Sequence, residues 1–397
     1  MSQTDPTQPN LAETTGPAVS VVETEDAVAR RAREAYFTAT QRQLIWARFK
    51  KNRTAMIAAT ILVLLILMGL FAPFLSPYDP SIAGRDRDYL NGAPQVPQFC
   101  DHNGCSARPF VYGFKTERSP VNLRLVTTVD TEDRRYVQFF VTGDDYKLFG
   151  FIPGNLHLFG VDEGFVHLFG TDDTGKDIFS RTLHAIYTSL AVGTLGVLIS
   201  FVLALIIGGV AGYFGGVTDG IIQMVTDAIR TIPIIPLFMA IAAFIPDTWS
   251  SEMRFFFISI IIGFINWPTL ARRVRTHLLV ERNQEYVLAS QLCGAPAGHI
   301  IRRHLLPSFT SYIIVDLVIS FPYIVLSETA LSFIGLGLKD PVNSLGVMLQ
   351  NTTSADVLLN YQWYFIPVFF FIALVLAFVF VGDGLRDAAD PYGGQKK

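Results

Sequence analysis

Charged side chains are scarce in this sequence. Asp, Glu, Lys and Arg together make up 16% of its 397 residues, whereas about 25% is usual for soluble domains. Hydrophobic residues make up 50%. This composition excludes an ordinary water-soluble domain and predicts a membrane protein. The net charge of -3 identifies no charged partner, because a sum does not show how the charges are distributed along the chain. We expect no nucleic-acid partner.

The sequence contains several long apolar segments. A helix needs about 20 mostly apolar residues to cross a bilayer. Six segments meet this requirement, namely 55–75, 190–213, 220–245, 255–271, 309–333 and 357–382. We therefore predict an all-α polytopic membrane protein with six transmembrane helices. A cleavable signal peptide is not expected, because the first apolar run follows a long polar segment and is long enough to span.

Lys and Arg are distributed unevenly around these runs. They are concentrated in residues 1–53 and in the segment between the fourth and fifth runs, and they are sparse in the short loops on the other side. Because short cytoplasmic loops carry an excess of positive charge, we expect both termini in the cytoplasm. The long segment between the first two runs then lies outside.

Composition divides the chain into six regions. Residues 1–25 read as a disordered cytoplasmic tail and 26–53 as a basic amphipathic cytoplasmic segment. Residues 54–75 form the first span. Residues 76–166 form an extracytoplasmic insert, in which the stretches "VNLRLVTTV" and "RRYVQFFV" predict short strands. A transmembrane core at 167–382 and a cytoplasmic tail at 383–397 complete the chain.

Cysteine is rare, with three residues in the whole chain. Cys100 and Cys105 both lie in the predicted insert, where an oxidising compartment favours a local disulfide. His102 lies between them, but a fourth ligand for structural zinc is not evident. A metal site is therefore not expected.

The chain also lacks a complete phosphate-binding loop. Residues 170–177 match G-x-x-x-x-G-K, but Asp177 stands where the pattern requires Ser or Thr. Asp172, Asp173 and Asp177 would crowd three carboxylates around a polyphosphate, and the segment is expected on the outer side, away from cytoplasmic ATP. We expect no nucleotide-binding site and no enzymatic activity in this chain.

The basic segment between the fourth and fifth runs, residues 274–307, has an unusual pattern. It predicts a helix over 285–293, a break at Gly294, Ala295 and Pro296, and a second helix ending before Pro307. Small residues such as Ala289 and Ser290 would permit close approach by a partner, and arginines could anchor acidic groups. An ordinary basic loop with a kink is the alternative.

This segment resembles the coupling motif of membrane subunits of ABC importers, Glu-Ala-Ala, three residues, Gly, nine residues, Ile, one residue, Leu-Pro. Leu288, Ala289 and Ser290 replace the opening triplet, and His304 replaces the Ile. Gly294, Leu306 and Pro307 match. Further similar stretches are "WARFKKNRTAM", "FAPFLSPYDP", "GTDDTGKDIFSR", "ETALSFIGLGL" and "GDGLRDAADPY". Together they resemble the second permease of dipeptide and oligopeptide importers, with a large insert.

The resemblance implies a permease of the bacterial inner membrane that does no covalent chemistry. Its implied partners are a second homologous permease, two cytoplasmic ATPase subunits that carry ATP and Mg, and a periplasmic solute-binding protein. The coupling residues that it implies are Glu285, Ala289, Ser290, Gly294, Ala295, Arg302, Arg303, His304, Leu306 and Pro307. An oligosaccharide, an opine or nickel remains an alternative to a peptide as substrate, and an ion-driven secondary transporter is the alternative function.

Four ionisable residues fall within the predicted spans. A charge at the bilayer centre costs about 2.5–3.5 kcal/mol on insertion scales, so such groups face a partner or a water-filled cavity. Asp227 and Arg230 are three residues apart and are expected to neutralise each other. Asp316 is expected in the lower solute pathway. Glu328, about 18 Å further along the helix, is expected to bind a helix terminus or a partner subunit.

Overall fold

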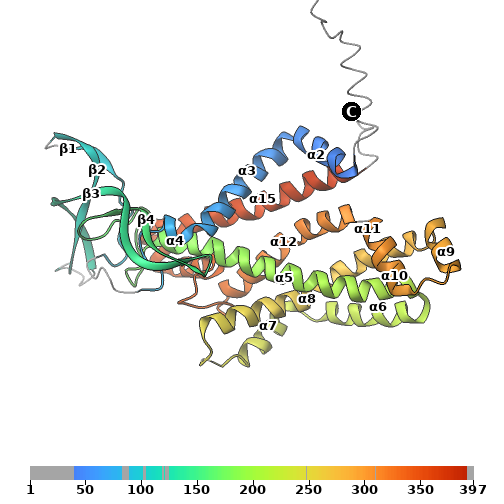
Figure 1. Ribbon diagram of the computed structural model, residues 1–397. Helices are drawn as coiled ribbons and strands as arrows, with labels where there is room; N and C mark the ends of the chain where they lie inside the picture. Colours follow the sequence, from blue (N-terminus) through green and yellow to red (C-terminus); the bar gives the residue numbers. More distant parts are fainter. Residues whose placement is uncertain are drawn as a thin grey trace, which may run out of the picture.

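The computed structural model has a β-sheet at one end of an elongated bundle of helices and short helices at the other end (Figure 1). It describes residues 40–82, 89–101, 104–118, 120, 125–246, 248–308 and 310–390. The tail predicted at 1–25 and the first part of the basic segment at 26–53 lie outside the described residues. The remainder of that segment contains helix α2, Gln41–Lys51.

Five helices among the described residues are long and apolar enough to cross a membrane. They are α3 (Arg53–Leu70), α5 (Ile178–Phe214), α8 (Ser251–Glu281), α12 (Thr310–Phe333) and α15 (Ile366–Ala389). The polytopic helical fold is therefore confirmed. A sixth span exists only if the two bent helices α6 (Gly216–Thr231) and α7 (Ile234–Ala243) are counted as one.

The single span predicted at 220–245 is wrong in shape. Helices α6 and α7 meet at an angle of 81°, and Pro233 lies between them. Proline has no backbone N–H to continue the helical ladder and disfavours a helical conformation at the preceding residue. The sequence-based assignment overlooked this break because the segment is apolar on both sides of the proline.

The other spans also differ from their predicted bounds. Helix α5 begins at Ile178 instead of at 190, and α8 runs from Ser251 to Glu281 instead of from 255 to 271. The first helix ends at Leu70, and a short helix α4 (Ala72–Leu75) follows with Pro73 in its first turn. The last predicted span is interrupted as well. Its first residues form α14 (Ala355–Asn360) and a 3-10 turn, η3 (Gln362–Phe365), before α15 begins and continues to Ala389, past the predicted boundary at 382.

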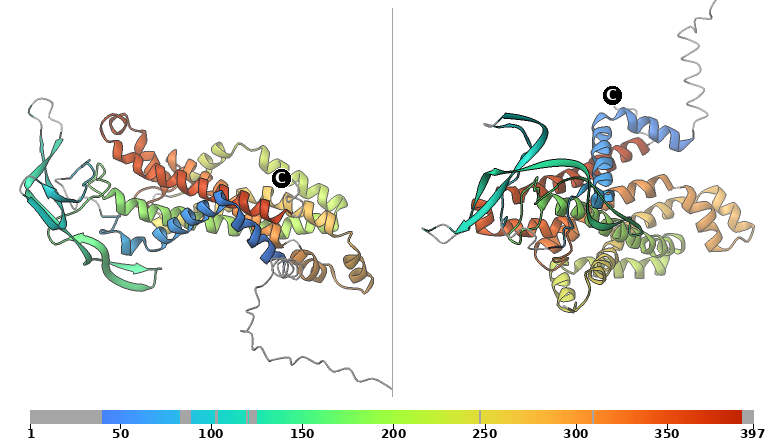
Figure 2. Two further views of the ribbon diagram at one scale, coloured as in Figure 1. Left: turned by 90° about the horizontal axis from the view of Figure 1, so that it is seen from above. Right: turned by 60° about the vertical axis from the view of Figure 1, so that its left-hand side comes forward.

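The insert is β-rich, as predicted. Its strands are β1 (Gln98–Asp101), β2 (Gly104–Arg118), β3 (Leu125–Leu148) and β4 (Ile152–Val161), and they form one antiparallel sheet in the order of the sequence. Cys100 and Cys105 face each other across the β1–β2 turn and form a disulfide. The sheet projects away from the helices (Figure 2).

Helices α5 and α8 approach each other closely along much of their length. A Cβ atom added to Gly208 on α5 would lie 2.4 Å from the carbonyl oxygen of Ala271 on α8, and one added to Gly263 on α8 would lie 2.8 Å from Cβ of Ile199. The Ser200 hydroxyl donates a 2.6 Å hydrogen bond to the Gly263 carbonyl. Such close packing through small residues is typical of helices in membranes, where lipid removes the hydrophobic driving force for association.

A buried polar cluster fixes the start of α5 against the loop before α13 (Leu345–Gln350). Arg181 pairs with Asp172, and its Nε donates a 2.7 Å hydrogen bond to Asn343. Asp177 caps α5 by accepting a 2.7 Å hydrogen bond from the Ser180 backbone N–H. Residues 170–177, which match part of the phosphate-binding pattern, thus form a turn. The charged side chains of this turn bind other residues of the same chain.

Replacing Arg181 by Met should destabilise the protein strongly. Its guanidinium and its partner Asp172 are both 2% exposed, and removing one member of a buried pair costs about 3–5 kcal/mol. Lys115→Met is the control, because Lys115 is 65% exposed in its pair with Asp130, and the loss of an exposed pair should change the stability little. Thermal unfolding in detergent would test this; equal losses for both variants would contradict the account.

Candidate coupling surface

Short helices fill the segment between α8 and α12. They are α9 (Glu285–Leu292), α10 (Ala297–Ile300), a π turn η1 (Ile301–Leu305) and α11 (Leu306–Ser308). The break predicted after the first helix is present, and Gly294 takes a φ of +79° there. This left-handed conformation is costly for residues with a Cβ atom. The end predicted before Pro307 is wrong, because Pro307 lies inside α11 and the ladder is instead widened to a π turn before it.

This segment has a small hydrophobic core of its own. Val287, Ile300 and Leu305 are completely buried, and they pack with Val274 and Leu278 of α8. Arg282 adds a polar connection, because its Nη1 donates hydrogen bonds to the carbonyls of Gly212 and Tyr213 at the end of α5, at 3.3 and 3.1 Å. A cation that binds the last carbonyls of a helix stabilises its C-terminus. The short helices are therefore held firmly against both α5 and α8.

The opposite face of the segment is exposed. Of the ten predicted coupling residues, six are exposed (Glu285, Ala289, Gly294, Arg302, Arg303, Pro307), and Ser290 and His304 are half-buried. Ala295 and Leu306 are half-buried as well, but they pack against the hydrophobic core. Two leucines that the sequence analysis did not single out as contact residues share this face. Leu288 is exposed, and Leu292 at the end of α9 is 90% exposed. Their helical spacing of four was visible in the sequence, but only the structure shows that this side of α9 is not in the core.

Tyr286 anchors the start of α9 without leaving a charge there. Its hydroxyl donates a 2.7 Å hydrogen bond to Oε2 of Glu281. Burial, together with the neighbouring Glu281 carboxylate, raises the pKa of Tyr286 above its ordinary value. The phenol therefore remains a hydrogen-bond donor to Glu281 at physiological pH.

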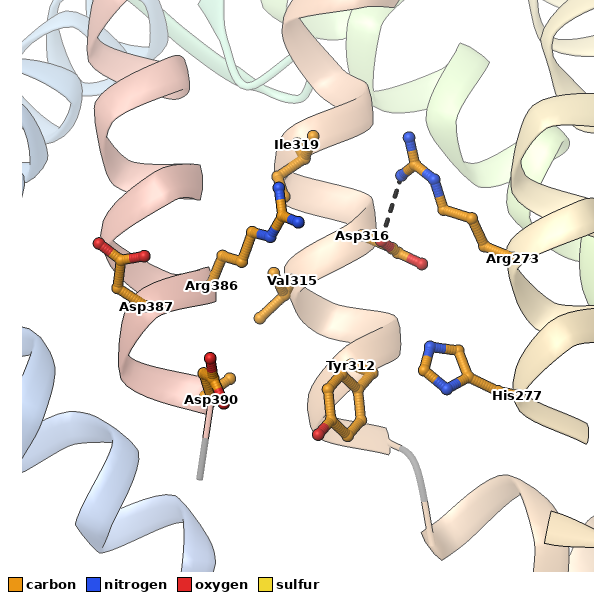
Figure 3. Close-up of a pocket in the computed structure, with 10 residues that line it drawn as sticks. Arg273, His277, Tyr312, Val315, Asp316, Ile319, Arg386, Asp387 and Asp390 are labelled. Atoms are coloured by element: carbon orange, nitrogen blue, oxygen red, sulfur yellow. Dashed lines mark hydrogen bonds and ion pairs between the residues drawn. The ribbon is translucent and has the colours of Figure 1, made fainter. Parts of the chain in front are cut away.

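Asp316 lines a cavity of about 570 Å³ between α8, α12 and α15. It forms a 3.1 Å ion pair with Arg273 of α8. Figure 3 shows this pair, with Arg386 of α15 turned toward α12 and His277 and Tyr312 closer to the end of the bundle. The volume is in the range of ligand-binding pockets, and the lining carries charges of both signs.

The other intramembrane residues have partners that the sequence did not reveal. Asp227 pairs with Arg272 of α8 and not with Arg230, so the predicted pairing within α6 is wrong. The long side chain of Arg272 reaches Asp227 from the neighbouring helix α8. Arg230 is exposed. Glu328 is fully buried and accepts a 2.7 Å hydrogen bond from Ser332. Ser344, which caps the N-terminus of α13, lies within hydrogen-bonding reach.

Comparison with known proteins now adds the family. The family described as "binding-protein-dependent transport system inner membrane component" matches residues 202–392, and "N-terminal TM domain of oligopeptide transport permease C" matches residues 40–94. The dipeptide transport system permease protein DppC of Bacillus subtilis is 37% identical over 221 residues, which cover 55% of this chain and 67% of that protein. The chain belongs to this permease family. It is thus a multi-pass transport subunit of an ABC importer and not a catalytic enzyme.

Two further members are named as oligopeptide permeases. The oligopeptide transport system permease protein OppC of Bacillus subtilis is 29% identical over 345 residues, which cover 87% of each chain. The OppC protein of Haemophilus influenzae is 36% identical and covers 55% of this permease and 68% of its own length. A solved inward-facing structure of the MetNI methionine ABC transporter covers 53% of this permease and 96% of that chain, with 18% identity and a TM-score of 0.42.

The exposed and buried leucines of the coupling segment should respond differently to truncation. Leu305→Ala should cost about 2–5 kcal/mol, because it leaves a cavity in a fully buried core. Leu292→Ala should change the stability by less than about 0.5 kcal/mol. Hydrogen exchange of the α9 amides would measure both. Loss of α9 protection in Leu292→Ala would show that this side chain is part of the core.

Proposed function

We propose that this permease is the second membrane subunit of an ATP-driven importer that moves peptides or similar small solutes from the periplasm to the cytoplasm by alternating access. Membership of the permease family supports this assignment, as do relatives that are named as dipeptide and oligopeptide permeases. Selection among solutes would rest mainly with a separate binding protein. The proposed location is the bacterial inner membrane, with both termini in the cytoplasm.

The single observation that carries the mechanism is the exposed apolar face of α9 on a rigid support. An apolar side chain that is 90% exposed, as Leu292 is, lies beside the small residues Ala289 and Gly294. Below this face, a core of fully buried residues connects α9 to α5 and α8. A partner that docks on the face and changes position can therefore move two long helices with it.

The occupant that we propose for this face is a cytoplasmic ATPase subunit. Two such subunits, one on this chain and one on a second homologous permease, would bind ATP and Mg between them, so this chain would hold no cofactor. Arg302 and Arg303 are exposed on the same segment and would contact acidic groups of the ATPase. The β-rich insert at the opposite end would face the periplasm and the solute-binding protein.

Asp316 is proposed to line the inner part of the solute pathway. Its cavity carries Arg273 and Arg386 as well as acidic groups, so it offers partners for both ends of a zwitterionic solute. Asp316 and Arg273 are half-buried and pair with each other in the absence of solute, which avoids the high cost of isolated charges within the membrane. Glu328, enclosed by hydroxyls close to α13, is instead assigned to structural support.

Gly294→Asp should abolish transport while the protein still inserts in the membrane. A Cβ atom at this position would meet none of the described atoms within 4 Å, so the new carboxylate would project into the docking space. Gly216→Asp is the matched control, because Gly216 also has a positive φ, +55°, and open surroundings. We expect ATPase subunits to co-purify with the control only. Normal uptake by Gly294→Asp would contradict the docking role.

Asp316→Asn should lower the rate of solute uptake severalfold and leave ATPase recovery unchanged. The substitution removes the negative charge that faces Arg273 but preserves the size of the side chain. Asp227→Asn provides the control, since that residue forms a more exposed pair and should retain near-normal uptake. Uptake assays in vesicles at matched protein levels would compare them. Equal rates in both variants would argue against a pathway role for Asp316.

A further inference from the structure

The turn between β3 and β4 is unusually apolar for the tip of a hairpin. Leu148 and Ile152 are paired across it, and Phe149, Gly150 and Phe151 form the loop. Every residue from Phe149 to Pro153 is exposed, and Phe151 is 75% exposed. Turns at the surface of a soluble domain normally carry Gly, Asn, Asp or Ser. Contiguous apolar exposure of this kind indicates an interaction surface.

The backbone conformation makes this choice of residues more informative. Phe149 has a φ of +54°, and Phe140, an exposed residue of β3, has a φ of +59°. A bulky residue in this region carries a steric cost that Gly or Asn would largely avoid. The chain therefore places phenylalanine at two positions where its backbone conformation disfavours it. The aromatic rings of Phe149 and Phe140, and not the backbone geometry of the turn, explain why phenylalanine occupies these two positions.

The two rings lie beside the C-terminal end of α3 and the short helix α4 that follows it. Phe149 packs edge-on against Phe71, with 5.8 Å between ring centroids, and Phe140 lies 6.5 Å from Phe74 of α4. Both β3 and β4 contact α4, and Figure 1 shows their hairpin beside the sheet end of the helices. The tip is thus fixed beside the point where the chain leaves the span.

The position of this point relative to the bilayer follows from α3. Its 18 residues span about 27 Å at 1.5 Å per residue, which is close to the roughly 30 Å hydrocarbon thickness. The large exposed apolar residues of α3 and its C-cap lie along one side, namely Ile57, Ile61, Val63, Leu64, Leu67, Leu70 and Phe71. This apolar stripe ends at the residue that Phe149 contacts. The hairpin tip continues the exposed apolar surface beyond the end of α3.

We propose that the β3–β4 tip inserts into the interfacial region of the lipid bilayer and anchors the sheet to the membrane surface. Aromatic side chains are favoured at this depth because it accommodates both apolar rings and polar backbone groups. Exposed Lys147, two residues before Phe149, can extend its ammonium group to lipid phosphates. The anchor would hold the sheet in one orientation relative to the spans, and it does not depend on which side of the membrane the sheet occupies.

Spin labels would test the proposal. In a Cys293→Ser background with the Cys100–Cys105 disulfide intact, Phe151→Cys is labelled in phosphatidylcholine–phosphatidylglycerol nanodiscs, and collisions with oxygen and with a water-soluble nickel chelate are compared. Val129→Cys is the control, because Val129 is also exposed but lies on the projecting part of the sheet. Ile152→Cys provides a second tip position in case the first variant does not fold.

A lipid anchor predicts that oxygen reaches the tip label several times more effectively than the nickel chelate, with the opposite preference at residue 129. Equal access of the chelate to both positions would overturn the proposal. Exclusion of both relaxants from the tip, in the chain alone or only after partner proteins are added, would assign the tip to a protein contact and would also overturn it.

Discussion

The close contact between α5 and α8 is the constraint on which the rest of the structure depends. Gly208 and Gly263 allow the two backbones to approach to a distance that any larger side chain would prevent. Helix α5 has 37 residues and is about 56 Å long at 1.5 Å per residue. It begins in the buried polar cluster around Arg181 and ends where Arg282 binds its last carbonyls. Helix α5 therefore connects the end of the bundle that carries the sheet with the end that carries the candidate coupling surface. Helix α8 packs along it.

Helix α8 also organises the charges in the membrane region. Arg272, Arg273 and Arg275 lie within four positions, and each pairs with a carboxylate from another helix. Two of the partners, Asp227 and Asp219, are on α6, and the third, Asp316, is on α12. A movement of the coupling segment, which continues directly from α8, would therefore shift the electrostatic partners around the Asp316 cavity. This connection gives a physical route from docking to the proposed solute pathway.

The sequence predicted features that depend on local chemistry. Apolar runs marked the spanning helices, the Gly294-Ala295-Pro296 stretch marked the end of α9, and alternating aromatic and β-branched residues marked the strands of the insert. It did not predict contacts between residues that are far apart in the sequence. Asp227 pairs with Arg272 because α6 and α8 are neighbours, which spacing along α6 could not show. The bend at Pro233 was a local signal that the surrounding hydrophobicity concealed, and Leu292 was identified as exposed only from the tertiary packing of α9.

The central claim is that movement of solute through this permease is driven by ATP hydrolysis on a docked partner. The most direct measurement is uptake of labelled dipeptides and oligopeptides into proteoliposomes that contain the complex purified from its native membranes, with the binding protein outside. The account predicts uptake that requires ATP with Mg on the ATPase side and persists without an ion gradient. Uptake by this chain alone, driven by an ion gradient and unaffected by ATP, would contradict it and identify a secondary transporter.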